Sequence, residues 1–168
     1  MRKTIIVSLL LTLSLALFGQ DVKNPNYRRG FSTEAEVGYV HEGGYLNWSV
    51  GANVFHGLYV GLGTGLQRYR FEGTDKMANF IPTYLHVRYS FLDKAVSPFI
   101  DLKGGLVSDY TRHFTGHGTD TEGVGVFFGP AVGVEYKHFG VKVGYYHKSI
   151  WSYRGEDNSC TVGVFYKF

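Results

Sequence analysis

The sequence predicts an all-β protein: an eight-stranded antiparallel up-and-down β-barrel that crosses a membrane. Three observations lead to this fold class. Alternation of apolar residues with small or polar ones recurs in eight segments, and no segment keeps the 3.6-residue period of a helix. The composition is rich in aromatic residues and glycine, with 13 Tyr, 13 Phe and 23 Gly against 4 Pro. The chain also ends on an alternating apolar strand whose last residue is Phe168.

The N-terminal residues 1–20 are predicted to be a secretory signal peptide. A basic start precedes the apolar run 5–18, and polar residues follow it. This run is too short for a comfortable membrane-spanning helix. Leu17 stands where a small residue is usual before a cleavage site, so the sequence leaves that site open. Residues 21–168, about 148 residues, are then predicted to form one barrel domain.

Charge and cysteine content narrow the classes of partner. Without Arg2 and Lys3, the 17 basic residues fall to 15 against 14 acidic residues, so the net charge is only +1. Nucleic acid is therefore not a predicted partner. The single cysteine, Cys160, excludes an internal disulfide. No cysteine comes directly after the apolar N-terminal run, which argues against a lipid-anchored protein. No cofactor is predicted.

The first half of the barrel is predicted to contain four strands. They are 31–41, 46–54, 58–67 and 81–91. Because side chains alternate between the faces of a strand, each of these segments has one largely apolar face. The apolar positions are Phe31, Ala35, Val37 and Tyr39, then Leu46, Trp48, Val50 and Val54, then Leu58, Val60, Leu62 and Leu66, then Ile81, Leu85, Val87, Tyr89 and Phe91. A tight turn is predicted at His56 and Gly57, between the second and third strands.

The second half repeats this pattern with four more predicted strands. They are 100–106, 124–136, 141–149 and 161–168. The apolar positions are Ile100, Leu102 and Leu106, then Val124, Val126, Phe128, Val132, Val134 and Tyr136, then Val143 and Tyr145, then Val162, Val164, Tyr166 and Phe168. A tight turn is predicted at 137–140 and a loop at 151–159. Pro130 removes a ladder donor within the sixth strand, so the register there is left open.

The less apolar face decides which side of the barrel meets lipid. A soluble barrel of the lipocalin type would turn its apolar face inward and expose a charged face to water. Here the second face is dominated by Gly, Ser, Asn and Ala, which suit a narrow interior. The apolar face is therefore predicted to contact lipid. A lower aromatic girdle is predicted from Phe31, Tyr89, Phe91, Tyr136, Tyr166 and Phe168. The opposite rim is predicted to carry Trp48, Tyr110 and Trp151.

Three acid–base pairs are predicted inside the barrel, each on neighbouring strands at similar depth. They are Glu34 with Lys167, Arg88 with Asp101, and Glu135 with Lys142. Pairing is expected because an isolated charge in a dry lumen is costly. An eight-stranded interior has almost no free bore, so these charges are predicted to plug the lumen.

The last strand places Tyr166 third from the end and Phe168 at the end. This pattern resembles the C-terminal signature of Gram-negative outer-membrane β-barrels, and the chain after the signal peptide resembles the small eight-stranded barrels of the OmpA/OmpX type. The resemblance implies a cell-envelope protein of the Gram-negative outer membrane, in contact with membrane lipids. It also implies that the barrel assembly machinery reads the C-terminal strand. We expect a monomer.

One chemical motif competes with a purely structural interpretation. His147 and Ser149 share the outward face of the seventh strand about 6.6 Å apart, so the hydroxyl can approach the imidazole. This resembles the His-x-Ser motif of the outer-membrane lipid A deacylases of the acyloxyacyl hydrolase type, which implies Ser149 as nucleophile and His147 as base. The family's orienting acid begins its last strand, where this chain has Cys160. Glu156 and Asp157 are the nearby carboxylates.

The sequence thus favours an integral barrel with a structural or surface-interaction role and no open pore. A lipid A acyl-ester hydrolase and a narrow porin remain alternatives, so enzymatic activity is left open. No metal site is predicted, because the spacing of His113, His117 and Asp120 matches no closed zinc set. The sequence names no surface ligand.

Overall fold

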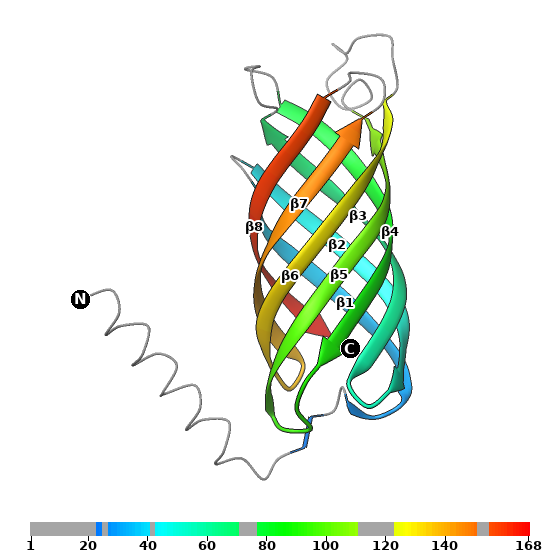
Figure 1. The fold of residues 1–168 in the computed structure, drawn as a ribbon, viewed down its shortest axis with the longest axis vertical. Helices are drawn as coiled ribbons and strands as arrows, with labels where there is room; N and C mark the ends of the chain where they lie inside the picture. The colour runs from blue at the N-terminus through cyan, green and yellow to red at the C-terminus, as the bar shows by residue number, and fades with distance from the viewer. Residues whose placement is uncertain (1–22, 25–26, 41–42, 71–76, 111–122, 151–154) are drawn as a thin grey trace, which may run out of the picture.

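Eight antiparallel strands form one closed barrel in chain order, and they cross its long axis obliquely (Figure 1). The strands are β1 (Gly30–Val40), β2 (Gly43–Phe55), β3 (Leu58–Arg70), β4 (Met77–Ser90), β5 (Val96–Asp109), β6 (Val124–Tyr136), β7 (Phe139–Ile150) and β8 (Gly155–Lys167). The predicted fold class is confirmed. This is a computed structural model, and it describes residues 23–24, 27–40, 43–70, 77–110, 123–150 and 155–168. In that part of the chain no helix has the length and apolar character needed to cross a membrane.

Several strands are longer than predicted, because ladder pairing continues beyond the apolar alternation that marks the lipid-facing part. The clearest case is β8, which begins at Gly155 instead of residue 161. Glu156 and Asp157 were predicted to lie in a loop, and this prediction is wrong. They lie on β8, with Glu156 opposite Ser149 on β7.

Other predictions fall on parts of the chain that the structure does not describe. They are the signal peptide at 1–20, the His113, His117 and Asp120 loop, and Trp151. The side chains of Glu156 and Asp157 are also outside the described part.

The tight turns lie where the sequence places them, at the end of the barrel opposite the long connections. His56 and Gly57 connect β2 to β3, and Gly57 has a φ of 74°, a left-handed conformation that favours glycine. A Cβ at this position would also approach the ring of Tyr27 to 2.8 Å. Lys137 adopts a φ of 53° in the turn between β6 and β7.

Pro130 interrupts the β6–β7 ladder without shifting its register. On one side Phe128 pairs with His147, and on the other Ala131 pairs with Gly144, so the two pairs share one register. Proline lacks the N–H that a ladder hydrogen bond needs, which accounts for the gap. The register that the sequence left open is therefore continuous.

The inner face is crowded by aromatic rings, and glycines make room for them. A Cβ on Gly129 would collide with the ring of Tyr146, and one on Gly140 would collide with the ring of Phe165. On the loop side, the buried apolar residues form a layer. It consists of Val40, Tyr45, Phe80, Tyr84, Val107, Phe127, Tyr146 and Ile150. The small residues of the inner face thus accommodate large side chains from neighbouring strands.

The outer face is apolar and exposed, as the alternation predicts. At the end with the tight turns, the ring of Tyr166 contacts Phe139 and Phe168, with centroids 5.3 and 4.8 Å apart. Trp48 was predicted at the opposite rim, and this is wrong. Its ring stacks on that of Phe168 at 6.0 Å. Trp48 pairs with Ala35 of β1, which also pairs with Tyr166 of β8, so closure of the barrel brings these rings together.

Both ends of the described chain meet the same barrel mouth. The N–H of Phe168 donates to the carbonyl of Thr33 at 2.8 Å, next to the β1–β8 ladder. Asn24 lies before β1 and is fully buried. Its Nδ2 donates to Oε1 of Glu135 on β6 at 2.7 Å. The segment that precedes the barrel therefore contributes a side chain to its interior.

Candidate functional site

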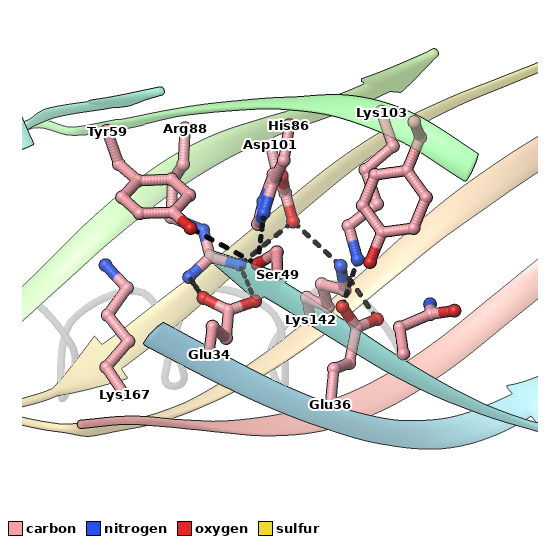
Figure 2. Close-up of polar contacts among 12 residues, drawn as sticks. Glu34, Glu36, Ser49, Tyr59, His86, Arg88, Asp101, Lys103, Lys142 and Lys167 are labelled. Atoms are coloured by element: carbon pink, nitrogen blue, oxygen red, sulfur yellow. Dashed lines mark hydrogen bonds and ion pairs between the residues drawn. The ribbon is translucent and has the colours of Figure 1, made fainter. Parts of the chain in front are cut away.

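Six buried charges form a continuous row across the lumen, which we call the lumen charge row (Figure 2). In order of contact they are Glu34, Arg88, Asp101, Lys142, Glu36 and Lys103. Acidic and basic groups alternate, and every side chain is at most 3% exposed. The residues come from β1, β4, β5 and β7, so the row connects opposite walls of the barrel.

Arg88 is the centre of one half of the row. Its guanidinium donates to both carboxylate oxygens of Glu34, with Nη2 2.9 Å from Oε1, and to Oδ2 of Asp101 at 3.0 Å. The rings of Phe99 and Phe165 lie against it, 4.6 and 3.9 Å from Cζ to the ring centroids. Two carboxylates and two aromatic faces therefore fix this cation in place.

Lys142 joins the two halves. Its Nζ lies 2.7 Å from Oδ2 of Asp101 and 2.8 Å from Oε1 of Glu36. Lys103 contacts the other oxygen of Glu36. Near the barrel mouth, Lys167 forms a separate pair with Glu135 at 3.3 Å.

The structure brings only one of the predicted pairs together, Arg88 with Asp101. Glu34 and Lys167 are backbone neighbours in the β1–β8 ladder, as the pairing assumed. Their side chains nevertheless turn to other partners, Glu34 to Arg88 and Lys167 to Glu135. In a narrow barrel, side chains from non-adjacent strands lie within reach of each other, and sequence neighbours do not identify those partners.

A buried hydrogen-bonded chain joins this row and was missed from the sequence. Nε2 of His86 lies 2.7 Å from Oδ1 of Asp101, and Nδ1 lies 3.0 Å from Oγ of Ser49. Tyr59 donates to the same oxygen at 3.3 Å. The alternation placed both His86 and Ser49 on the inner face, which was the available signal. They lie on β4 and β2, with β3 between them, so their meeting depends on the curvature of the closed sheet.

The outward site at His147 has a partner that the sequence did not suggest. Asn158 pairs with His147 across the β7–β8 ladder, and its Oδ1 lies 2.8 Å from Nδ1 of His147. Tyr145 donates to the same oxygen at 2.6 Å. Cys160, expected at the acid position, is instead opposite Tyr145. Within the described contacts, no hydrogen bond joins Ser149 to His147.

A closed eight-stranded barrel with an apolar exterior and buried charges in its interior is typical of the outer-membrane class of small β-barrels. No family model matches the sequence, and no curated protein matches it. Solved structures of outer-membrane barrels do match, among them the three described below, and at these identities the likeness concerns the fold.

The three structures differ little in their similarity to this chain. Neisserial surface protein A is 15% identical, with a TM-score of 0.56 over 82% of this chain and 97% of that one. The N-terminal barrel domain of Pseudomonas aeruginosa OprF is 17% identical, with a TM-score of 0.54 over 84% and 100%. The outer membrane enzyme PagL is 16% identical, with a TM-score of 0.54 over 82% and 98%. The localisation predicted from the sequence, the outer membrane of a Gram-negative bacterium, agrees with these neighbours.

Proposed function

We propose that this chain is an integral outer-membrane protein with a structural or surface-interaction role and a lumen closed to solutes. The lumen charge row carries this proposal. It fills the interior with six side chains that are at most 3% exposed, and its three acidic and three basic groups balance in charge. Opening a path through it would separate buried pairs, and a buried charge that loses its partner costs about 3–5 kcal/mol.

The layer of buried apolar residues on the loop side supports the same conclusion. The rings of Tyr84 and Phe127 lie 5.8 Å apart, and those of Phe127 and Tyr146 lie 5.9 Å apart. A solute would meet this apolar layer in addition to the charges.

The outer wall supports the proposal that the protein is a monomer whose main partner is membrane lipid. Its exposed side chains are apolar, with Leu62 68% and Val132 55% exposed. Tyr166 and Phe168 also face outward, and we propose that the assembly machinery recognises them on the C-terminal strand.

Electrical recording across planar lipid bilayers tests the closed lumen. The purified protein is expected to insert and give no steady conductance, while a general porin in the same bilayers conducts. Steady current through the wild-type barrel would contradict the proposal and favour the narrow porin.

A second candidate function is acyl-ester hydrolysis on the lipid-facing wall, favoured by the contact between His147 and Asn158. An Asn158 oxygen that accepts the Nδ1–H leaves Nε2 of His147 free to act as a base. Ser149 Oγ would attack the ester carbonyl as its proton passes to Nε2 and then to the departing alkoxide. Water would next release the fatty acid from the acylated serine. PagL, an outer membrane enzyme, shares this fold, so an eight-stranded barrel can carry an enzyme.

Two features keep hydrolysis in second place. An amide orients an imidazole but does not neutralise the imidazolium that forms during attack. No described contact brings Ser149 to His147, so the nucleophile is not activated in this arrangement.

Mass analysis of lipid A tests the hydrolase directly. Lipid A from cells that express the wild-type chain is expected to match that from cells with Ser149→Ala. Loss of an ester-linked acyl chain with the wild type alone would make the protein an enzyme.

A further inference from the structure

A groove crosses the outer wall where β2, β3 and β4 approach the loop side of the barrel (strands in Figure 1). Its volume is about 350 Å³, within the range of about 300–1,000 Å³ found for ligand sites. Its outward-facing residues form two rows. They are Gly44, Arg68 and Asn79 near the strand ends, and Leu46, Leu66 and Ile81 below them.

Two features of the local sequence produce the hollow. Gly44 has no side chain, and an added Cβ would meet only the carbonyl oxygen of Gly38, at 3.5 Å. In the β3–β4 ladder, no pair joins positions 65–66 to 81–82 among the described residues. Pro82 has no N–H to donate there. The wall therefore has a missing side chain beside a gap in its ladder.

The two rows differ in chemistry. Arg68 is exposed and forms no ion pair with any described residue, whereas Leu46 and Leu66 below it are 54% and 50% exposed. A guanidinium above an apolar surface suits a ligand with anionic oxygens at one end and a hydrocarbon chain at the other, and Arg binds phosphate with two parallel hydrogen bonds. Tyr110, whose N–H donates to the Asn79 carbonyl at 2.8 Å, adds an exposed aromatic residue at the level where membrane interfaces favour one.

We propose that this groove binds lipid A, the phosphorylated acyl glycolipid of the outer leaflet. A phosphate contacts Arg68, and one acyl chain lies over Leu46, Leu66 and Ile81. The inference rests on the proposed outer-membrane placement, since only then does the loop side face the outer leaflet. Charge complementarity with Arg68 favours an anionic lipid whose phosphate has no balancing cation of its own, and placement at the outer leaflet selects lipid A among such lipids.

Native mass spectrometry of the purified, delipidated barrel tests the proposal. The barrel is titrated in detergent with lipid A, with dephosphorylated lipid A and with phosphatidylglycerol. We expect one lipid A to bind, and about tenfold weaker binding of the other two, which corresponds to about 1.4 kcal/mol. Equal binding of all three lipids would show nonspecific adsorption and overturn the proposal.

Variants test separately how the charge of Arg68 and the open space at Gly44 contribute to lipid A binding. Arg68→Gln removes the cation and Gly44→Leu fills the groove, and each is expected to weaken lipid A binding about tenfold. Arg68→Lys keeps a cation but loses the two parallel hydrogen bonds, so its affinity for lipid A should lie between those of the wild type and Arg68→Gln. Matched controls at the opposite end are Lys137→Gln, which removes a cation, and Gly30→Leu, where an added Cβ meets nothing within 4 Å. Both controls should bind like the wild type.

Each variant is first checked for different gel mobility before and after boiling, the mark of a detergent-resistant folded barrel. If Arg68→Gln and Gly44→Leu fold and still bind lipid A like the wild type, the groove proposal is wrong while the proposed function stands. If one variant fails to fold, the other still decides. If the wild type conducts steadily, the closed-lumen function fails independently of lipid binding.

Discussion

One histidine lies on the inner face of the barrel, on β4, and another lies on the outer face, on β7. Each has part of what a hydrolytic site needs. His86 faces the lumen between Ser49 and Asp101, with the connectivity of a Ser-His-Asp triad. His147 faces outward beside Asn158, two residues before Ser149. The inner histidine has its carboxylate but is fully buried. The outer one is accessible to lipid, yet an amide stands at the acid position.

The difference shows what these residues are adapted to. The carboxylate of Asp101 contacts Arg88 and Lys142 as well as His86, so it serves the internal charge balance first. Inside a narrow barrel, such polar connectivity arises from the need to pair every buried group. A triad-like pattern alone therefore does not identify an active site.

The largest effect should come from Asp101→Asn. This change removes the carboxylate that three neighbours share and leaves the row with excess positive charge, so we expect a loss of about 3–5 kcal/mol in the free energy of unfolding. Urea unfolding of the folded barrel in lipid measures it. Asn158→Ala on the outer wall is the control and should change little. Similar stabilities for the two variants would contradict the expected difference between the inner and outer faces of the barrel.

A double-mutant cycle tests which partners meet in the lumen. Glu135→Gln and Lys167→Met should be non-additive in unfolding free energy, with a coupling of about 0.5–3 kcal/mol, because their charged atoms lie 3.3 Å apart. Glu135→Gln with Lys142→Met should be closer to additive, since Lys142 contacts Asp101 and Glu36 instead. The reverse ranking would favour the pairing expected from adjacent strands.

Replacement of each histidine by Phe compares the two faces directly. His86→Phe removes the two buried hydrogen bonds that the imidazole makes with Ser49 and Asp101, so we expect a destabilisation of about 1–3 kcal/mol. His147→Phe should stay within about 0.5 kcal/mol, as for most surface substitutions. The measurement is the same urea titration, and equal losses would contradict the difference in burial.

The smallest effect on stability should come from Asn158→Asp, within about 0.5 kcal/mol, because the residue is exposed. This change supplies the carboxylate that a triad needs. Lipid A from cells with this variant should be compared with that from Asn158→Asp combined with Ser149→Ala. Acyl loss with the first alone would mean that the amide at this position is what keeps the outer site inactive.

Much of the fold was predictable because alternation reports which face a side chain occupies. It placed Glu34, Arg88 and Lys167 inside and His147 outside, as the structure has them. It did not report distances across the lumen, so the partner of Glu34 was misassigned. Trp48 was misplaced for a related reason, since its height depends on how the closed sheet is staggered.

The outer site was only half predictable. The His-x-Ser spacing is local, and so it was visible in the sequence. The residue that orients His147 depends on where β8 begins. The polar residues at the start of β8 have the composition of a loop, so the sequence placed that start too late. With β8 starting at Gly155, Asn158 comes opposite His147 and the expected acid position moves by two residues.

The buried Asn24 links the segment before β1 to a strand far along the chain. Its acceptor, Glu135, lies 111 positions further along the chain. The amide therefore has nowhere to dock until β6 is in place, and contacts between such distant segments form slowly because a long loop must close first. The Asn24 contact is therefore a long-range contact that requires β6 to be in place.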